Sequence, residues 1–114
     1  MPDAKLPDVV WRPRAELDLK SIVIYIGYEQ GQPQAAKRIH DSIVAAVERV
    51  RLFPEIGKRV DIEELRHGDY RYVIAGNYYV FYRYLDDPGE ARIAVYRVLH
   101  QRQDIDTYGF VNLS

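Results

Sequence analysis

The strongest constraint on the fold is the run at residues 77–104, which reads as two long strands joined by a turn. Residues 78–84 are mostly aromatic, and such side chains favour extended backbone. The sequence Asp-Asp-Pro-Gly at 86–89 supplies turn chemistry, because its acidic side chains bond nearby backbone and its glycine tolerates positive φ. We therefore predict a long β-hairpin that the rest of the chain covers or extends.

The second strand of this hairpin, at residues 91–99, alternates in character. Successive side chains of an extended strand point to opposite faces of a sheet. One face is then predicted to carry Ile93, Val95, Arg97 and Leu99. The other face is predicted to carry Arg92, Ala94, Tyr96 and Val98.

Upstream of the hairpin, the pattern predicts two more strands and a pair of helices. These segments are a strand at 9–11, a helix at 14–29, a helix at 33–53, a loop at 54–69 and a strand at 70–75. Pro33 opens the second helix and Pro54 stops it, because proline is accepted only in a first helical turn. Gly76 and Asn77 form a tight turn into the hairpin.

The order β-α-α-β-β-β defines an α+β fold. We expect a mostly antiparallel four-stranded sheet with a helical hairpin packed on one face. The length of 114 residues predicts a single domain spanning 1–114, in which residues 1–7 are expected to be flexible.

Composition excludes several classes of protein. The chain has 16 basic and 17 acidic residues, so it does not resemble a general polyanion binder, and no direct sequence-specific binding to DNA is predicted. The absence of cysteine rules out disulfides and thiolate metal sites and suits a reducing cytoplasm. We find no signal peptide and no apolar run long enough to cross a bilayer, so a cytoplasmic protein is expected.

Polar groups gather where the last strand ends. They are Arg97, His100, Arg102 and Asp104, followed by Tyr108. His100 could act as a general acid or base and Arg102 could hold a phosphate, which are parts of a metal-independent ribonuclease. The simpler interpretation is a hydrogen-bonded strand end. The three histidines are scattered and predict no metal site.

The tyrosines of the hairpin and of the preceding strand allow two interpretations. They could stack on nucleic-acid bases. They could also be cross-strand pairs that contribute to a protein interface, because tyrosine is large and amphipathic. We favour packing combined with contact to a protein partner.

The chain resembles the RelE/ParE toxins of bacterial type II toxin–antitoxin modules, and in particular their ParE-like branch. The matching residues are Trp11-Arg12-Pro13 with Ala15, Asp18 and Leu19; Ala35-Ala36 and Ile39; Phe53-Pro54 with Gly57; Leu65-Arg66; the aromatic strand at 78–84; and Arg97-Val98-Leu99-His100 with Arg102 and Asp104. Each match is short, but together they run in order over nearly the whole domain.

The resemblance implies a toxin that poisons DNA gyrase and that a cognate ParD-like, DNA-binding antitoxin neutralises in a hetero-oligomer, such as a heterotetramer. No cofactor is implied. The ribonucleases of the superfamily carry an Arg directly after the first Tyr of the aromatic strand, where this chain has Tyr79. A ribonuclease site would therefore be incomplete, and a toxin that is not an enzyme is the main hypothesis.

Two alternatives remain open at this point. One is a ribosome-dependent mRNA interferase that uses His100 and Arg102, with Arg66 or Arg83 on the phosphate. The other is an inactive protein that only binds an antitoxin and co-regulates its operon.

Two sets of site residues follow. For the gyrase target we expect contacts from Arg97, His100, Arg102 and Tyr108, whose polar side chains have no evident packing role. For the antitoxin we expect a groove lined by Leu17, Ile24, Tyr28, Tyr79 and Phe81, into which a helix could lie.

Overall fold

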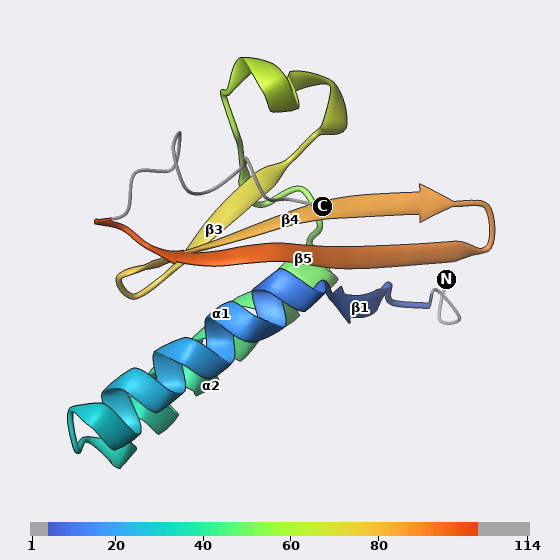
Figure 1. The fold of residues 1–114 in the computed structure, drawn as a ribbon. Helices are drawn as coiled ribbons and strands as arrows, with labels where there is room; N and C mark the ends of the chain where they lie inside the picture. The colour runs from blue at the N-terminus through green and yellow to red at the C-terminus, as the bar shows by residue number, and fades with distance from the viewer. Residues whose placement is uncertain (1–4, 103–114) are drawn as a thin grey trace.

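The computed structural model of the protein describes residues 5–102. Its elements are β1 (Asp8–Trp11), α1 (Pro13–Ile24), a π-helical segment (Tyr25–Glu29), α2 (Pro33–Leu52), β2 (Lys58–Arg59), a 3₁₀ helix (Glu63–Gly68), β3 (Arg71–Ala75), β4 (Tyr78–Asp87) and β5 (Glu90–His100) (Figure 1). The predicted order of helices and long strands is confirmed. No helix within residues 5–102 is long and apolar enough to cross a membrane.

The sheet has five strands in the order β1-β5-β4-β3-β2, one more than the sequence predicted. The additional strand β2 lies in the expected loop, where Lys58 pairs with Tyr72 and Arg59 with Arg71. Strand β1 runs parallel to β5, and the other neighbouring strands are antiparallel. The expected α+β architecture is therefore confirmed, with a short edge strand added.

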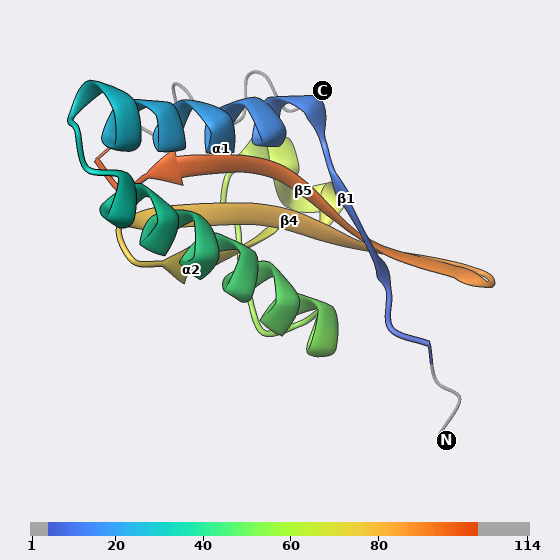
Figure 2. The same cartoon turned by 90° about the horizontal axis from the view of Figure 1, so that it is seen from below.

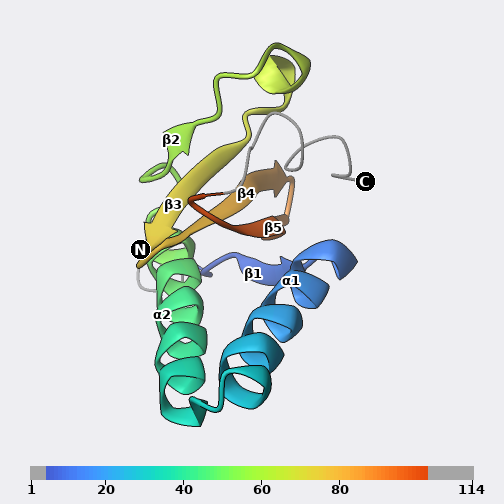
Figure 3. The same cartoon turned by 60° about the vertical axis from the view of Figure 1, so that its left-hand side comes forward.

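The two helices form an antiparallel hairpin on one side of the sheet (Figure 1, Figure 2 and Figure 3). Each begins with a proline, Pro13 in α1 and Pro33 in α2, where the missing N–H costs no hydrogen bond. Near the link between the helices, Gly27 lies so close to Ala36 that an added Cβ would be 3.2 Å from the alanine Cβ. Small residues at this crossing let the helices approach.

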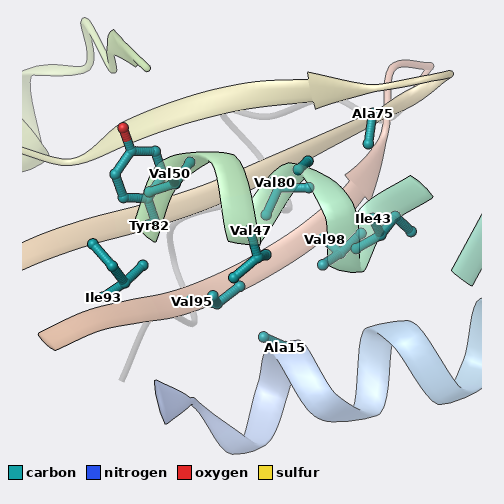
Figure 4. Packing of buried hydrophobic residues seen from close by; sticks show 11 residues of the cluster. Ala15, Ile43, Val47, Val50, Ala75, Val80, Tyr82, Ile93, Val95 and Val98 are labelled. Atoms are coloured by element: carbon teal, nitrogen blue, oxygen red, sulfur yellow. The ribbon is translucent and has the colours of Figure 1, made fainter. Parts of the chain in front are cut away.

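The main hydrophobic core lies between the helical hairpin and the sheet (Figure 4). Helix α2 contributes a stripe at helical spacing that is almost fully buried, consisting of Ile43, Ala46, Val47 and Val50. The sheet contributes Ala75, Val80, Tyr82, Ile93, Val95 and Val98. This surface is what holds the helical hairpin against the sheet.

A β-bulge interrupts the pairing of β4 with β5 and overturns the simple alternation expected for β5. Phe81 pairs with Arg97 and Tyr82 with Val95, so Tyr96 is an extra residue on its strand. An inserted residue reverses the face on which later side chains lie. Val98 accordingly packs in the main core, whereas Leu99 packs in a second cluster, so the prediction that Leu99 shares a face with Ile93 and Val95 was wrong.

The second cluster lies on the opposite side of the sheet from the helices, which we call the outer face. The chain segment that carries β2 and the 3₁₀ helix folds over this side (Figure 1). Its buried members are Val60, Phe81 and Leu99, against which pack Ile62, Leu65, Tyr70, Tyr72 and Tyr79. This segment thereby covers part of the outer face.

Tyr82 anchors the segment after α2, and its hydroxyl provides a first test of the fold. The side chain is 1% exposed. Its hydroxyl donates to the carbonyl oxygen of Pro54 at 2.7 Å and accepts the backbone N–H of Gly57 at 2.9 Å. Tyr82→Phe should lower the free energy of unfolding by about 1–3 kcal/mol in urea denaturation, because two backbone groups lose their partner. A loss below about 0.5 kcal/mol would contradict this role.

The same substitution should change the alkaline limit of stability. Burial is the main cause that raises the pKa of Tyr82 above its ordinary value of 10.0. A raised pKa means that the stabilising contribution is complete below pH 10.0 and is lost as the pH rises through the folded-state pKa. Tyr82→Phe should therefore show a shallower loss of stability above pH 10.0 than the parent chain.

Candidate functional site

An apolar groove runs along the helical hairpin, on the side that does not face the sheet. Two hollows of about 450 Å³ and 430 Å³ share Val23, Ile24 and His40, so they form one continuous groove. The first is lined by Trp11, Glu16, Leu19, Lys20, Val23, Ile24, His40 and Val44. The second is lined by Val23, Ile24, Gly27, Tyr28, Pro33, Ala36, Lys37 and His40. We call this feature the helical groove.

The helical groove combines an apolar floor with a charged rim. Ile24 is 56% exposed and Tyr28 is 84% exposed, which is unusual for side chains of this size. Lys37 on the rim donates to Asp41 at 2.8 Å, and this hydrogen bond raises the pKa of the lysine and lowers that of the aspartate. The surface therefore offers apolar contact in the centre and ionic contact at the edge.

The structure separates the five residues predicted to meet the antitoxin. Leu17, Ile24 and Tyr28 are exposed on the first helical segment, as expected, although Leu17 does not line the groove. Tyr79 is half-buried in the second cluster. The expectation that Phe81 lines an open groove was wrong, because it is 1% exposed beneath the segment that covers the outer face.

Arg97 is not the exposed polar group that the sequence suggested. Its Nε and Nη2 donate to the carboxylate of Asp18 in α1 at 2.8 Å and 3.1 Å. The same carboxylate accepts the backbone N–H of Val98 at 2.9 Å. Strand β1 pairs with β5 only as far as Val95. Beyond that point the Asp18 carboxylate, instead of a neighbouring strand, accepts the N–H of Val98. Arg97 is consequently a packing residue in this structure.

His100 and Arg102 do lie together at the end of β5. The backbone N–H of Arg102 donates to Nδ1 of His100 at 3.1 Å, and the imidazole meets the ring of Tyr78 edge-on at a centroid distance of 5.2 Å. Burial raises the pKa of Tyr78. Tyr108, the fourth residue predicted to meet the target, lies outside the described part of the chain.

A hollow of about 330 Å³ opens beside His100. Its lining consists of Asp18, Ser21, Ile22, Tyr25, Tyr78, Val98, Leu99 and His100. Among these described residues there is no Lys or Arg that could hold a scissile phosphate. The arrangement offers hydrogen-bonding and aromatic contact more than charge stabilisation.

Comparison with known proteins decides the family. The family model for the ParE toxin of the type II toxin–antitoxin system parDE matches residues 9–105. This chain belongs to the ParE toxin family. Toxin ParE1 of Mycobacterium tuberculosis, in the strains CDC 1551 / Oshkosh and H37Rv, is 37% identical to this toxin over 94 residues, which cover 82% of this chain and 89% of the relative.

Solved structures support the fold of the toxin. The chromosomal ParDE system from P. aeruginosa matches with a TM-score of 0.60 at 15% identity, over 83% of this chain and 96% of the other. The YoeB/ParE toxin from Agrobacterium tumefaciens matches with a TM-score of 0.59 at 13% identity, over 82% and 97%. The toxin–antitoxin complex RelBE2 from Mycobacterium tuberculosis gives 0.53 at 20% identity, over 84% and 99%. The family model and the 37% identical relative confirm the RelE/ParE superfamily expected from the sequence, and the solved structures agree with its fold.

Sequence reasoning missed two features of this ParE-family toxin. The first is the role of Asp18, which binds Arg97 and the backbone of Val98. From the sequence alone, Asp18 is only one of the residues that match the family. The second is the contribution of α2 to the helical groove, where His40 and Val44 are four residues apart and outside the buried stripe. That spacing places both side chains on one helix face and was a usable signal.

Proposed function

We propose that this toxin inhibits growth by poisoning DNA gyrase and that it does so without catalysing a reaction of its own. The observation that carries the proposal is the match of residues 9–105 to the ParE toxin family. The comparisons establish that the chain is a toxin of a type II toxin–antitoxin system. DNA gyrase as its target is our proposal. The proposal places the toxin in the cytoplasm, where gyrase and the chromosome lie.

The surroundings of His100 favour a binding role for the end of β5. RNA cleavage would require a base near the attacking hydroxyl and a cation near the phosphate. Here Nδ1 of His100 accepts the backbone N–H of Arg102, and the described lining of the neighbouring hollow has no Lys or Arg. We assign His100 and Arg102 to contact with gyrase, and Tyr108 remains a predicted third contact.

We further propose that a cognate antitoxin neutralises the toxin by laying an amphipathic helix into the helical groove. Such a helix would place apolar residues at helical spacing along Ile24 and Tyr28. Charged residues on its flanks would meet Glu16, Lys20 and Lys37 on the rim. A ParD-like partner with its own DNA-binding half would make the assembly a heterotetramer, in which the antitoxin provides the contact with the operator.

The decisive experiment is a cleavage assay with supercoiled plasmid, purified gyrase, ATP and the toxin freed of antitoxin. We expect linear DNA with covalently attached gyrase to accumulate. The double variant His100→Ala/Arg102→Ala should lower this accumulation at least about tenfold, because each substitution would remove a contact of the size found at interface hot spots.

Two results would count against the gyrase proposal. One is intact plasmid in the presence of a preparation that still stops growth. The other is the appearance of cuts in translated mRNA, which a gyrase poison leaves whole and which would favour the ribosome-dependent alternative with His100 as its base. A preparation that binds antitoxin but never inhibits growth would favour the other alternative, an inactive protein that only binds an antitoxin and co-regulates its operon.

A further inference from the structure

Away from the segment of residues 58–68, the outer face continues towards the free end of the β4–β5 hairpin (Figure 1). Strand register places Ala94 of β5 between Val10 of β1 and Arg83 of β4. Ala94 is small and only 4% exposed, so its larger neighbours cover it. Side chains directly opposite one another in neighbouring strands share a face. Arg83 therefore stands on the outer face, opposite Ala94.

Four side chains near this position form a continuous stack, which we call the Arg–Tyr row: Arg12, Tyr96, Tyr70 and Arg83. The guanidinium carbon of Arg12 lies 5.7 Å from the ring centroid of Tyr96. The rings of Tyr96 and Tyr70 meet edge-on with centroids 5.3 Å apart. The guanidinium carbon of Arg83 lies 5.0 Å from the ring centroid of Tyr70. Both cations are thus held on aromatic faces.

The arginines of the row differ from most other arginines of the sheet because they contact no carboxylate among the side chains that the structure describes. Arg97 binds Asp18 and Arg71 lies 3.4 Å from Asp69, whereas Arg12 and Arg83 form no such ion pair with a described side chain. The Nε of Arg83 is buried and has no hydrogen-bond partner among the described residues. A buried, unsatisfied donor on a charged group is costly, so the guanidinium of Arg83 lacks the local compensation that an ion-paired arginine has.

We propose that the Arg–Tyr row binds the phosphodiester backbone of DNA without regard to sequence. Resting on the proposed function, the proposal makes this row the contact between the toxin and the DNA segment that gyrase holds. Strands β1 and β4 flank β5, so the backbones that carry Arg12 and Arg83 lie roughly 10 Å apart. One nucleic-acid strand presents repeated oxyanions to both guanidiniums, and each guanidinium can donate two parallel hydrogen bonds to a phosphate.

Phosphate fits this row better than an acidic peptide does. The tyrosine hydroxyls add donors of the kind that commonly contact phosphate oxygens. Ala94 beside the row is only 4% exposed and opens no pocket, whereas docking of a peptide side chain would require one. Because the net charge of the whole chain is −1, DNA binding must depend on these local contacts and should be weak without gyrase.

The test is fluorescence anisotropy of a short labelled DNA duplex titrated with the toxin freed of antitoxin, repeated over a range of salt concentrations. We expect weak binding whose logarithm falls linearly with the logarithm of salt concentration. Arg12→Gln and Arg83→Gln should each reduce the slope of that line by about 1. Arg12→Lys keeps the charge and should keep the slope.

The control is Arg49→Gln, which removes an exposed arginine from α2 on the other side of the sheet. Thermal unfolding of each variant checks that the fold is retained, and the exposed Arg12 provides the test if Arg83→Gln does not fold. Equal slopes for Arg12→Gln and the parent chain would overturn the proposal. So would unchanged DNA binding combined with lost affinity for the antitoxin, which would assign the row to an acidic peptide.

The plasmid assay separates this proposal from the proposed function. Gyrase poisoning that persists undiminished in the Arg12→Gln/Arg83→Gln variant would overturn the role of the row and leave gyrase as the target. DNA binding that depends on the row, in a toxin that leaves gyrase unaffected, would support the DNA site and contradict the gyrase proposal.

Discussion

Replacing Asp18 with alanine should lower the free energy of unfolding by about 3–5 kcal/mol, because it removes the carboxylate that a buried guanidinium binds. The side chains of Arg97 and Asp18 are only 7% and 15% exposed. Two guanidinium nitrogens and the backbone N–H of Val98 donate to this single carboxylate. Urea denaturation of the Asp18→Ala variant and of the parent chain at neutral pH would measure the loss.

An exposed ion pair provides the control for this prediction. Asp41→Ala breaks a contact of 2.8 Å with Lys37, whose side chain is 77% exposed. Pairs of this kind contribute little to stability, so this variant should unfold close to the parent chain. The double variant Asp18→Leu/Arg97→Met should recover much of the loss, because apolar residues of similar size can replace a buried ion pair. Similar stabilities for Asp18→Ala and Asp41→Ala would refute the structural role of Asp18.

Replacing Ile24 with arginine should weaken antitoxin binding about a hundredfold, which is the size of effect found at interface hot spots. Ile24 is shared by the two hollows of the helical groove and therefore lies at its centre. A long charged side chain there would fill the apolar floor and leave its charge against apolar surface. Because Ile24 is 56% exposed in the free toxin, the substitution should leave the free toxin folded.

Leu52→Arg is a matched control, since Leu52 is 55% exposed at the other end of the helical hairpin and lines neither hollow. Titration calorimetry with the cognate antitoxin would compare the two variants. In cells, the antitoxin should rescue growth from the Leu52 variant but not from the Ile24 variant. Equal affinities of the two variants for the antitoxin would argue against the helical groove as its binding site.

The correct predictions from sequence share a physical basis in short-range signals. Pro33 and Pro54 bound α2 because proline disrupts a helix interior but is tolerated in its first turn. The turn at Gly76 and Asn77 joined β3 to β4 as expected, and Gly76 adopts a φ of +60°, which glycine tolerates. Family membership was also visible, since it rests on ordered short motifs that run through nearly the whole domain.

The site residues were predicted less well, because their environment depends on contacts between distant parts of the chain. Arg97 was expected at the surface, yet Asp18, 79 residues earlier, binds it. Phe81 was expected in an open groove, yet the segment containing Val60 covers it. Neither contact leaves a trace in local periodicity, since a polar residue bound by a buried carboxylate and one facing water look the same in sequence.

The amino-acid sequence by itself determined the family, the order of the elements and the two faces of α2, because local backbone preferences and apolar spacing decide these. Only the tertiary structure decided which side chains remain open to a partner. A single extra residue at Tyr96 reverses the faces of the strand that follows it, and pairing with β4 reveals that insertion. The exposure of a side chain depends on which distant segment packs over it, and that is decided when the helices and the 58–68 segment close on the two faces of one sheet.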